Sequence, residues 1–90
     1  SLRKETLRME QTRVAILAIV VENPAHAEQL NQILHQYRQY IIGRMGIPYD
    51  KRGISLISVA VDAPTGIISA MSGKIGMLDG ITAKAVYSKL

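Results

Sequence analysis

The sequence predicts a ferredoxin-like α+β fold, in which a βαββαβ chain forms a two-layer sandwich. Three observations predict it. Apolar, β-rich segments occur at four places along the chain. Two intervening segments have apolar residues at helical spacing, each with a proline near its start, and a short polar stretch separates the second strand from the third. Two right-handed crossovers joined by a hairpin give a four-stranded antiparallel sheet with both helices on one face.

The first predicted strand is the run RVAILAIVVE, and folding is expected to begin near Thr12. The run is apolar without alternation, and a strand of this kind is buried on both faces in the middle of a sheet. Residues 1–11 are polar and lack a sustained apolar stripe, so we expect a flexible or helical N-terminal tail, or an expression remnant. Residues 12–90 are expected to form the single folded domain.

The first predicted helix lies in the segment ENPAHAEQLNQILHQYRQY. Asn23 can cap it, and Pro24 suits its first position. Glutamate and glutamines occupy one face, so the helix is amphipathic and is expected to lie on the sheet. The apolar stripe on the other face recurs at helical spacing: Leu30, Ile33, Leu34, Tyr37 and Ile41.

The second predicted strand, roughly Tyr40 to Tyr49, contains the stretch IIGRMGIP, in which glycines and a proline are poor strand residues. In this fold the second strand is an edge strand. Three interpretations compete: a bulge or kink, close packing against a second chain, and a small-molecule pocket in which Arg44 is the counter-charge for an anion. The candidate ligand-binding residues are Gly43, Arg44, Met45 and Gly46.

A polar hairpin turn, YDKRG, leads into the third predicted strand, ISLISVAVD. Pro64 marks the beginning of the second helix, and Asp62 or Thr65 can cap it. Gly76 or Gly80 can end that helix in a left-handed turn. The last predicted strand, ITAKAVYSK, alternates two sets of side chains. The first and third strands are the most apolar, in agreement with their central position in the sheet.

The second face of the sheet is left uncovered by the two helices. The first strand presents apolar side chains to both faces, so the uncovered face is apolar as well. Exposed apolar patches of this kind mark a partner surface, and the simplest partner is a second copy of the chain. We expect a homodimer or tetramer, formed by stacking sheet faces or extending sheet edges. The alternative is that small residues such as Ala15 and Ala18 leave a surface that needs no partner.

The net charge is +4 and is spread thinly along the chain. A nucleic-acid binder usually has a denser basic stripe, so nucleic acid is the alternative partner. No apolar run approaches the roughly 20 residues that span a bilayer, and cysteine is absent. We therefore expect a cytoplasmic protein with no membrane association and no disulfides. The candidate nucleic-acid contacts are Arg3, Lys4, Arg8 and Arg13.

Neither a catalytic constellation nor a metal site is predicted, so we expect a non-enzymatic protein without a cofactor. Most acidic residues fall in turns and at element ends, where capping explains them. His26 and His35 are nine residues apart on the predicted first helix, so they point to different sides. The stretch SGKIG lacks the spacing and the preceding strand of a phosphate loop.

Three segments carry a resemblance to a known family: RVAILAIVVEN, LNQILHQYRQYIIGRMGIPY and GISLISVAVDAPTGIISAMSGKIGMLDGITAK. In this order they resemble the regulators of the iron-only hydrogenase system, over about residues 12–89. The resemblance implies an ACT-like fold, similar to the C-terminal domain of nickel-responsive repressors. Relatives of that fold work as oligomers and hold small effectors at subunit interfaces.

The resemblance therefore implies a homo-oligomeric regulatory domain, in the class of transcriptional regulators, that senses a small molecule or binds a protein partner. Only about eleven residues precede the first strand, and the cysteine of the repressors' nickel site is missing. Neither their ribbon-helix-helix domain nor their nickel site is expected here. The alternatives are a nucleic-acid-binding regulator that uses the basic tail, and a purely structural oligomerisation module.

Overall fold

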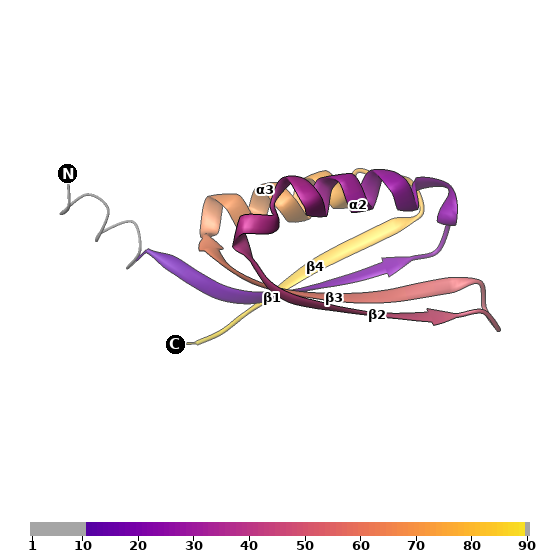
Figure 1. Cartoon of the computed structure of the whole chain (residues 1–90), viewed down its shortest axis with the longest axis horizontal. Helices are drawn as coiled ribbons and strands as arrows, with labels where there is room; N and C mark the ends of the chain where they lie inside the picture. The colour runs from indigo at the N-terminus through magenta and orange to yellow at the C-terminus, as the bar shows by residue number, and fades with distance from the viewer. Residues whose placement is uncertain (1–10, 90) are drawn as a thin grey trace.

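Four strands and two α-helices follow one another in the predicted βαββαβ order, with a 3₁₀ turn at each end of the first α-helix (Figure 1). The computed structural model describes residues 11–89. The sheet is antiparallel throughout, with the strand order β2-β3-β1-β4, so β1 and β3 are central as expected. The chain thus has the ACT-like ferredoxin fold. The elements are β1 (Thr12–Val21), η1 (Pro24–His26), α2 (Ala27–Gln36), η2 (Arg38–Tyr40), β2 (Ile41–Tyr49), β3 (Ile54–Pro64), α3 (Thr65–Gly76) and β4 (Ile81–Tyr87).

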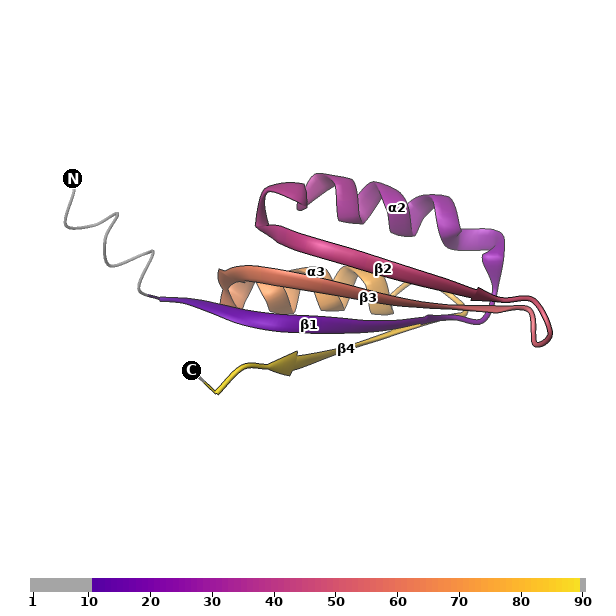
Figure 2. The same ribbon diagram turned by 60° about the horizontal axis from the view of Figure 1, so that its bottom comes forward.

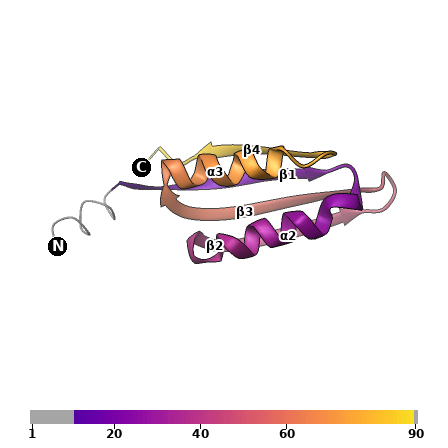
Figure 3. The ribbon, with the colours of Figure 1, turned by 90° about the horizontal axis from the view of Figure 1, so that it is seen from above.

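Both α-helices lie on one face of the sheet, and the other face carries no element among the described residues (Figures 1 and 2). Seen from above, α3 lies over the β1–β4 side and α2 over the β2–β3 side (Figure 3). The two layers enclose the core, so each strand has a helix-covered face and an uncovered face. We call the latter the open face.

The core fills the space between the helices and the sheet. In β1 alternate residues point into it, and Leu17 lies opposite Val59 of β3, both fully buried. Burial of a side chain of this size contributes on the order of 1.5–3 kcal/mol to stability. The buried apolar set is Ala15, Leu17, Ile19, Val21, Leu30, Leu34, Tyr37, Val59, Val61, Ala63, Ile68, Met71, Ile75 and Ile81.

The first helix is shorter than its apolar stripe predicts. Asn23 does cap the chain, accepting a hydrogen bond of 2.9 Å from the backbone N–H of Ala25, but it caps the 3₁₀ turn η1 rather than an α-helix. The α-helix α2 ends at Gln36, and after the turn η2 the next residue, Ile41, already belongs to β2. Ile41 still packs against the core, which explains why its spacing extended the helical pattern.

The second helix has the predicted boundaries, directly after Pro64 and at Gly76, but not the predicted capping. β3 runs to Pro64, which is itself the residue before α3, and no side chain caps this end, so neither Asp62 nor Thr65 has the predicted role. The helix ends at Gly76, and the left-handed residue is Gly80, with a φ of 75°. Gly80 accepts backbone hydrogen bonds from Glu22 and Asn23, so this turn joins the starts of β4 and η1.

The edge strand β2 contains a bulge near its start. Ile41 pairs with Val61 of β3, but Gly43 pairs with Ala60, so Ile42 is an extra residue in the ladder. The predicted bulge in the IIGRMGIP stretch is therefore confirmed. Because side chains alternate between faces, one extra residue exchanges the faces of all residues that follow it.

Candidate functional site

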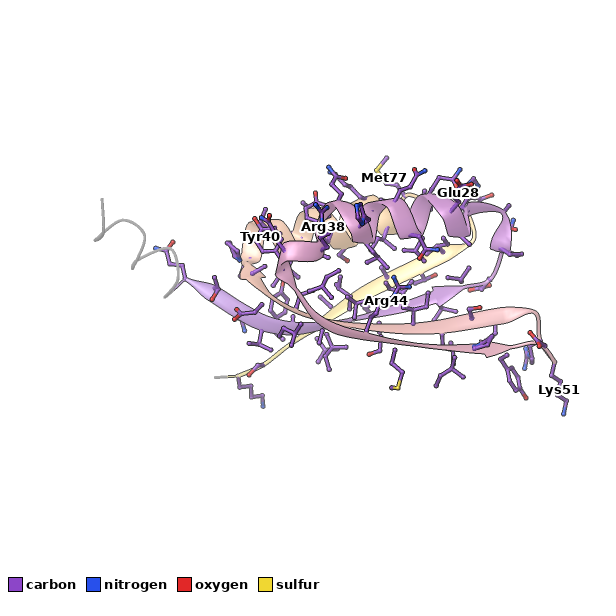
Figure 4. All side chains as sticks on the ribbon, viewed as in Figure 1. Glu28, Arg38, Tyr40, Arg44, Lys51 and Met77 are labelled. Atoms are coloured by element: carbon purple, nitrogen blue, oxygen red, sulfur yellow. The ribbon has the colours of Figure 1, made fainter. Side chains whose placement is uncertain are left out.

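The open face is the largest exposed apolar feature of the described residues. Residues 11–89 expose nine large apolar side chains. The pairing of the strands shows that seven of the nine lie on the open face. Figure 4 shows side chains projecting from the sheet on the side away from the helices. The predicted apolar second face is thus present. The seven are Val14 and Ile16 of β1, Met45, Ile47 and Tyr49 of β2, Leu56 of β3 and Val86 of β4.

Large and small side chains alternate on the open face, so its surface is uneven. Ser58, Ala60 and the bare backbone of Gly43 form a shallow hollow beside Ile16 and Met45. A side chain placed on Gly43 would meet nothing within 4 Å, so the glycine is not required by its own chain. A face that has both hollows and projecting side chains can interlock with a second surface.

The candidate ligand-binding residues divide between the two faces of β2. Gly43 pairs with Ala60 and Met45 with Ser58, which places both on the open face. Arg44 pairs with Val59, whose side chain is buried in the core, so Arg44 lies on the helix-covered side. Gly46 shares that side, with Ile57 of β3 as its nearest side chain. Three of the four, Gly43, Arg44 and Met45, line the shallow hollow of the open face, and Gly46 does not. The strand thus brings three predicted residues to one hollow but divides the four between its two faces.

Arg44 reaches past the edge of the sheet to α2. Its Nη2 donates a hydrogen bond of 3.3 Å to the side-chain Oδ1 of Asn31. Figure 4 shows Arg44 between α2 and the strands, with Arg38 at the level of the helices. Both arginines line a hollow of about 390 Å³ at this edge. We call it the edge hollow; its lining residues are Asn31, Leu34, His35, Arg38, Ile41 and Arg44.

Of the residues that line the edge hollow, Arg44 was among the predicted site residues and its polar neighbours were not. Asn31, His35 and Arg38 follow one another at spacings of four and three residues. That spacing puts them on one side of a helix. The sequence signal for this site was a polar stripe at one border of an amphipathic helix, followed by an edge strand that contains an arginine.

The candidate nucleic-acid contacts are only partly described. Arg3, Lys4 and Arg8 lie outside the described residues. Arg13 is engaged within the chain: its Nη2 donates a hydrogen bond of 3.1 Å to the backbone oxygen of Ser88, and its guanidinium lies 4.4 Å from the centre of the Tyr87 ring. Arg13 thus connects the start of β1 to the end of β4 through these two contacts.

The two histidines lie apart, in different elements. His26 closes the turn η1, and His35 is exposed in the last turn of α2. Within residues 11–89, no group of three or more histidine, cysteine, aspartate or glutamate side chains could hold a metal ion. In that same part of the chain, no helix has the length and apolar character needed to cross a membrane.

Comparisons with solved structures found two informative likenesses. The uncharacterized protein TM1266 from Thermotoga maritima is similar with a TM-score of 0.83 and 32% sequence identity, over 87% of this chain and 99% of that chain. A formyltetrahydrofolate deformylase from Pseudomonas putida KT2440 is similar with a TM-score of 0.59 and 14% identity, over 81% of this chain and 28% of that one. The second likeness concerns the fold alone. A comparison with curated protein sequences gave no match.

A protein-family model matches residues 13–85, almost all of the described fold. Its description is "TM1266-like: Iron-only hydrogenase system regulator, putative", which is that of a regulator rather than an enzyme. The match agrees with the resemblance inferred from the sequence. With this match and the identity to TM1266, the chain belongs to the TM1266-like family of iron-only hydrogenase system regulators.

Proposed function

We propose that this chain is a cytoplasmic, non-enzymatic regulatory domain of the iron-only hydrogenase system that works by self-association and by sensing a small ligand beside β2. The observation that carries the proposal is the open face, on which seven large apolar side chains are exposed. The family description supports the regulatory role.

The size of the open face favours a protein partner. Strands about 4.8 Å apart, with about eight residues of about 3.3 Å each, give the four-stranded sheet a face on the order of 500 Å². This area is that of the whole face, with polar side chains such as Ser58 and Lys84 included, and the largest apolar patch of a monomeric protein, about 300–600 Å², is often functional. Each large side chain that becomes buried contributes on the order of 1.5–3 kcal/mol before the costs of association.

A second copy of the same chain is the partner that the relief of this face supports. In a two-fold dimer each patch meets its own copy, so the patch must be self-complementary. The hollow over Gly43 lies beside the projecting Met45 on the same face, which suits such an arrangement. Asp62 and Lys84 add one acid and one base at the margin of the face, so stacked copies need not oppose like charges.

The strand β2 links self-association to ligand sensing. Met45 would contact the partner copy, while the neighbouring Arg44 lies on the opposite face beside α2. A ligand that binds beside Arg44 and prefers one position of β2 would shift the equilibrium between free and associated chains by its differential affinity. By linkage, association would change the affinity for the ligand by the same factor.

The test is sedimentation velocity of the wild-type chain and two lysine variants over a hundredfold range of concentration. Met45→Lys places a charge on the open face, on the edge strand β2, and is expected to leave a monomer at all concentrations. Ser69→Lys is the matched control, because Ser69 is exposed on α3, on the opposite side of the molecule. A wild-type chain that stays monomeric throughout, or equal effects of the two variants, would refute the proposal.

A further inference from the structure

The edge hollow is built from three elements that the fold brings together. Asn31, Leu34 and His35 come from α2, Arg38 from the turn η2, and Arg44 from the edge strand β2. The bulge at Ile42 is what turns Arg44 toward this side. The hollow is thus a product of the tertiary fold and not of one helix end.

The charge of the edge hollow is unbalanced. Two guanidinium groups line it, and no carboxylate does so among the described residues. Glu28 lies on the same side of α2, one turn before Asn31, but does not line the hollow. The hollow therefore presents an excess of positive charge to the solvent.

The end of α2 accounts for one of the two arginines. The Nη1 of Arg38 donates a hydrogen bond of 3.0 Å to the backbone oxygen of His35, as a cation at a helix C-terminus should. Arg44 has no such role, and its hydrogen bond of 3.3 Å goes to a neutral amide. A guanidinium has five N–H donors, so most donors of Arg44 remain directed at the hollow and the solvent.

The floor of the edge hollow is apolar. Leu34 is buried, and Ile41 is half-buried against the core. A hollow of about 390 Å³ with two cationic groups at its border and an aliphatic floor fits a small ligand with one anionic end and one hydrocarbon end. The planar fork of a guanidinium matches a carboxylate in geometry, with two parallel N–H···O bonds.

We propose that the edge hollow binds a small organic carboxylate, with Arg44 and Arg38 on the carboxylate and Leu34 and Ile41 against a short alkyl chain. This inference deepens the ligand-sensing function proposed above and rests on it. It names the chemical class of the ligand and the residues on the helix-covered side of β2 that hold it.

A structural role of Arg44 makes a different prediction. A charged side chain that points inward from an edge strand also discourages pairing with another chain. That role needs one charge at the edge, but it needs neither the second guanidinium nor the amide of Asn31 that holds the first. It also predicts no saturable binding of a carboxylate.

The test is a titration with pentanoate, followed by amide chemical shifts, of the wild-type chain, Arg44→Gln and Arg52→Gln. Arg52 is the matched control, since it is exposed in the β2–β3 turn, far from α2. The wild-type chain and the control should saturate with equal affinity, with shifts confined to residues around Asn31, Arg38 and Arg44. Loss of the charged partner in Arg44→Gln should weaken binding about tenfold or more.

Three further probes define the class of ligand. Acetate should bind more weakly than pentanoate, by about fourfold for each methylene that the floor buries. Pentanol, which has the chain without the charge, and inorganic phosphate, which has the charge without the chain, should both bind more weakly than pentanoate. Equal binding of pentanol or phosphate, equal affinities of Arg44→Gln and Arg52→Gln, or the absence of any saturation would overturn the inference.

Failure here is distinguishable from failure of the proposed function. If the chain self-associates through the open face but pentanoate does not bind, the carboxylate site is wrong and the self-association stands. If pentanoate binds to a chain that stays monomeric, the site stands and the proposed assembly is wrong.

Discussion

The two faces of the central strand β1 are both apolar, but the helices cover only one of them. Leu17 and Ile19 point toward the helices and are 0% and 1% exposed. Ile16, between Ala15 and Leu17 in the chain, points to the open face and is 47% exposed. All of these side chains are apolar, so the sequence of the strand does not distinguish its faces. The helix layer covers one face of β1, while the other face is equally apolar and no element of residues 11–89 covers it.

The largest expected effect separates these two faces directly. Leu17→Ala should cost about 3–5 kcal/mol in the free energy of unfolding, because it leaves a cavity between fully buried neighbours. Ile16→Ala should cost less than about 1 kcal/mol in a dilute, monomeric sample, because its side chain is already half exposed. Guanidinium denaturation at two protein concentrations measures both values.

The concentration dependence sharpens the comparison. If the open face is an interface, the cost of Ile16→Ala should rise with protein concentration, since association adds stability by mass action. The cost of Leu17→Ala should depend on concentration far less. A loss for Ile16→Ala as large as that for Leu17→Ala in the most dilute sample would show that a single chain already covers the open face.

A smaller effect is expected at the turn that precedes β4. Gly80 has a φ of 75°, and a side chain there would collide with Asn23. Gly80→Ala should cost about 2–4 kcal/mol, from the left-handed conformation and the steric conflict together. Gly53→Ala is the control: Gly53 also has a positive φ, of 66°, but nothing lies within 4 Å of the added atom, so its cost should be about 1–2 kcal/mol. Thermal unfolding of the two variants in parallel measures the difference, and equal losses would rule out the collision.

The smallest effect concerns the outer surface of the helix layer. Gly73 is exposed within α3, with open space around it. Gly73→Ala should stabilise the fold by about 0.5–1 kcal/mol, because alanine loses less backbone entropy in a helix. Its sedimentation behaviour should match that of the wild type. If the substitution instead weakens self-association, the helix layer and not the open face meets the partner copy.

The strands and their order could be predicted because β-branched apolar runs and the crossover rule leave few alternatives. The end of α2 could not, because Ile41 lies at the right spacing to continue the helical stripe while serving β2. The contact of the Lys74 ammonium with the Tyr37 ring, at 4.9 Å from its centre, joins α3 to the end of α2. No local pattern predicts it, since it depends on how the two helices pack.

The sequence predicted which segment contains the candidate site but not how its side chains are arranged in space. The glycines of IIGRMGIP indicated an irregular edge strand, and the bulge is there. Simple alternation from Ile41 would put Arg44 on the open face, where the proposed partner copy binds. The extra residue in the ladder reverses this parity and sends Arg44 to α2, where its neighbours come from a distant part of the sequence.

The uncharged segment Val14–Val21 also affects how the chain behaves before it has folded. Short, β-prone segments without charge or proline are the kind that stack into amyloid-like fibrils. Arg13 and Glu22 stand at its two ends as charged gatekeepers, which slow such stacking without removing the cause. If the proposed assembly forms through the open face, a newly synthesised chain has two competing fates, ordered pairing with a folded copy and disordered aggregation. The rate of folding, relative to the rate at which unfolded chains meet, decides between them.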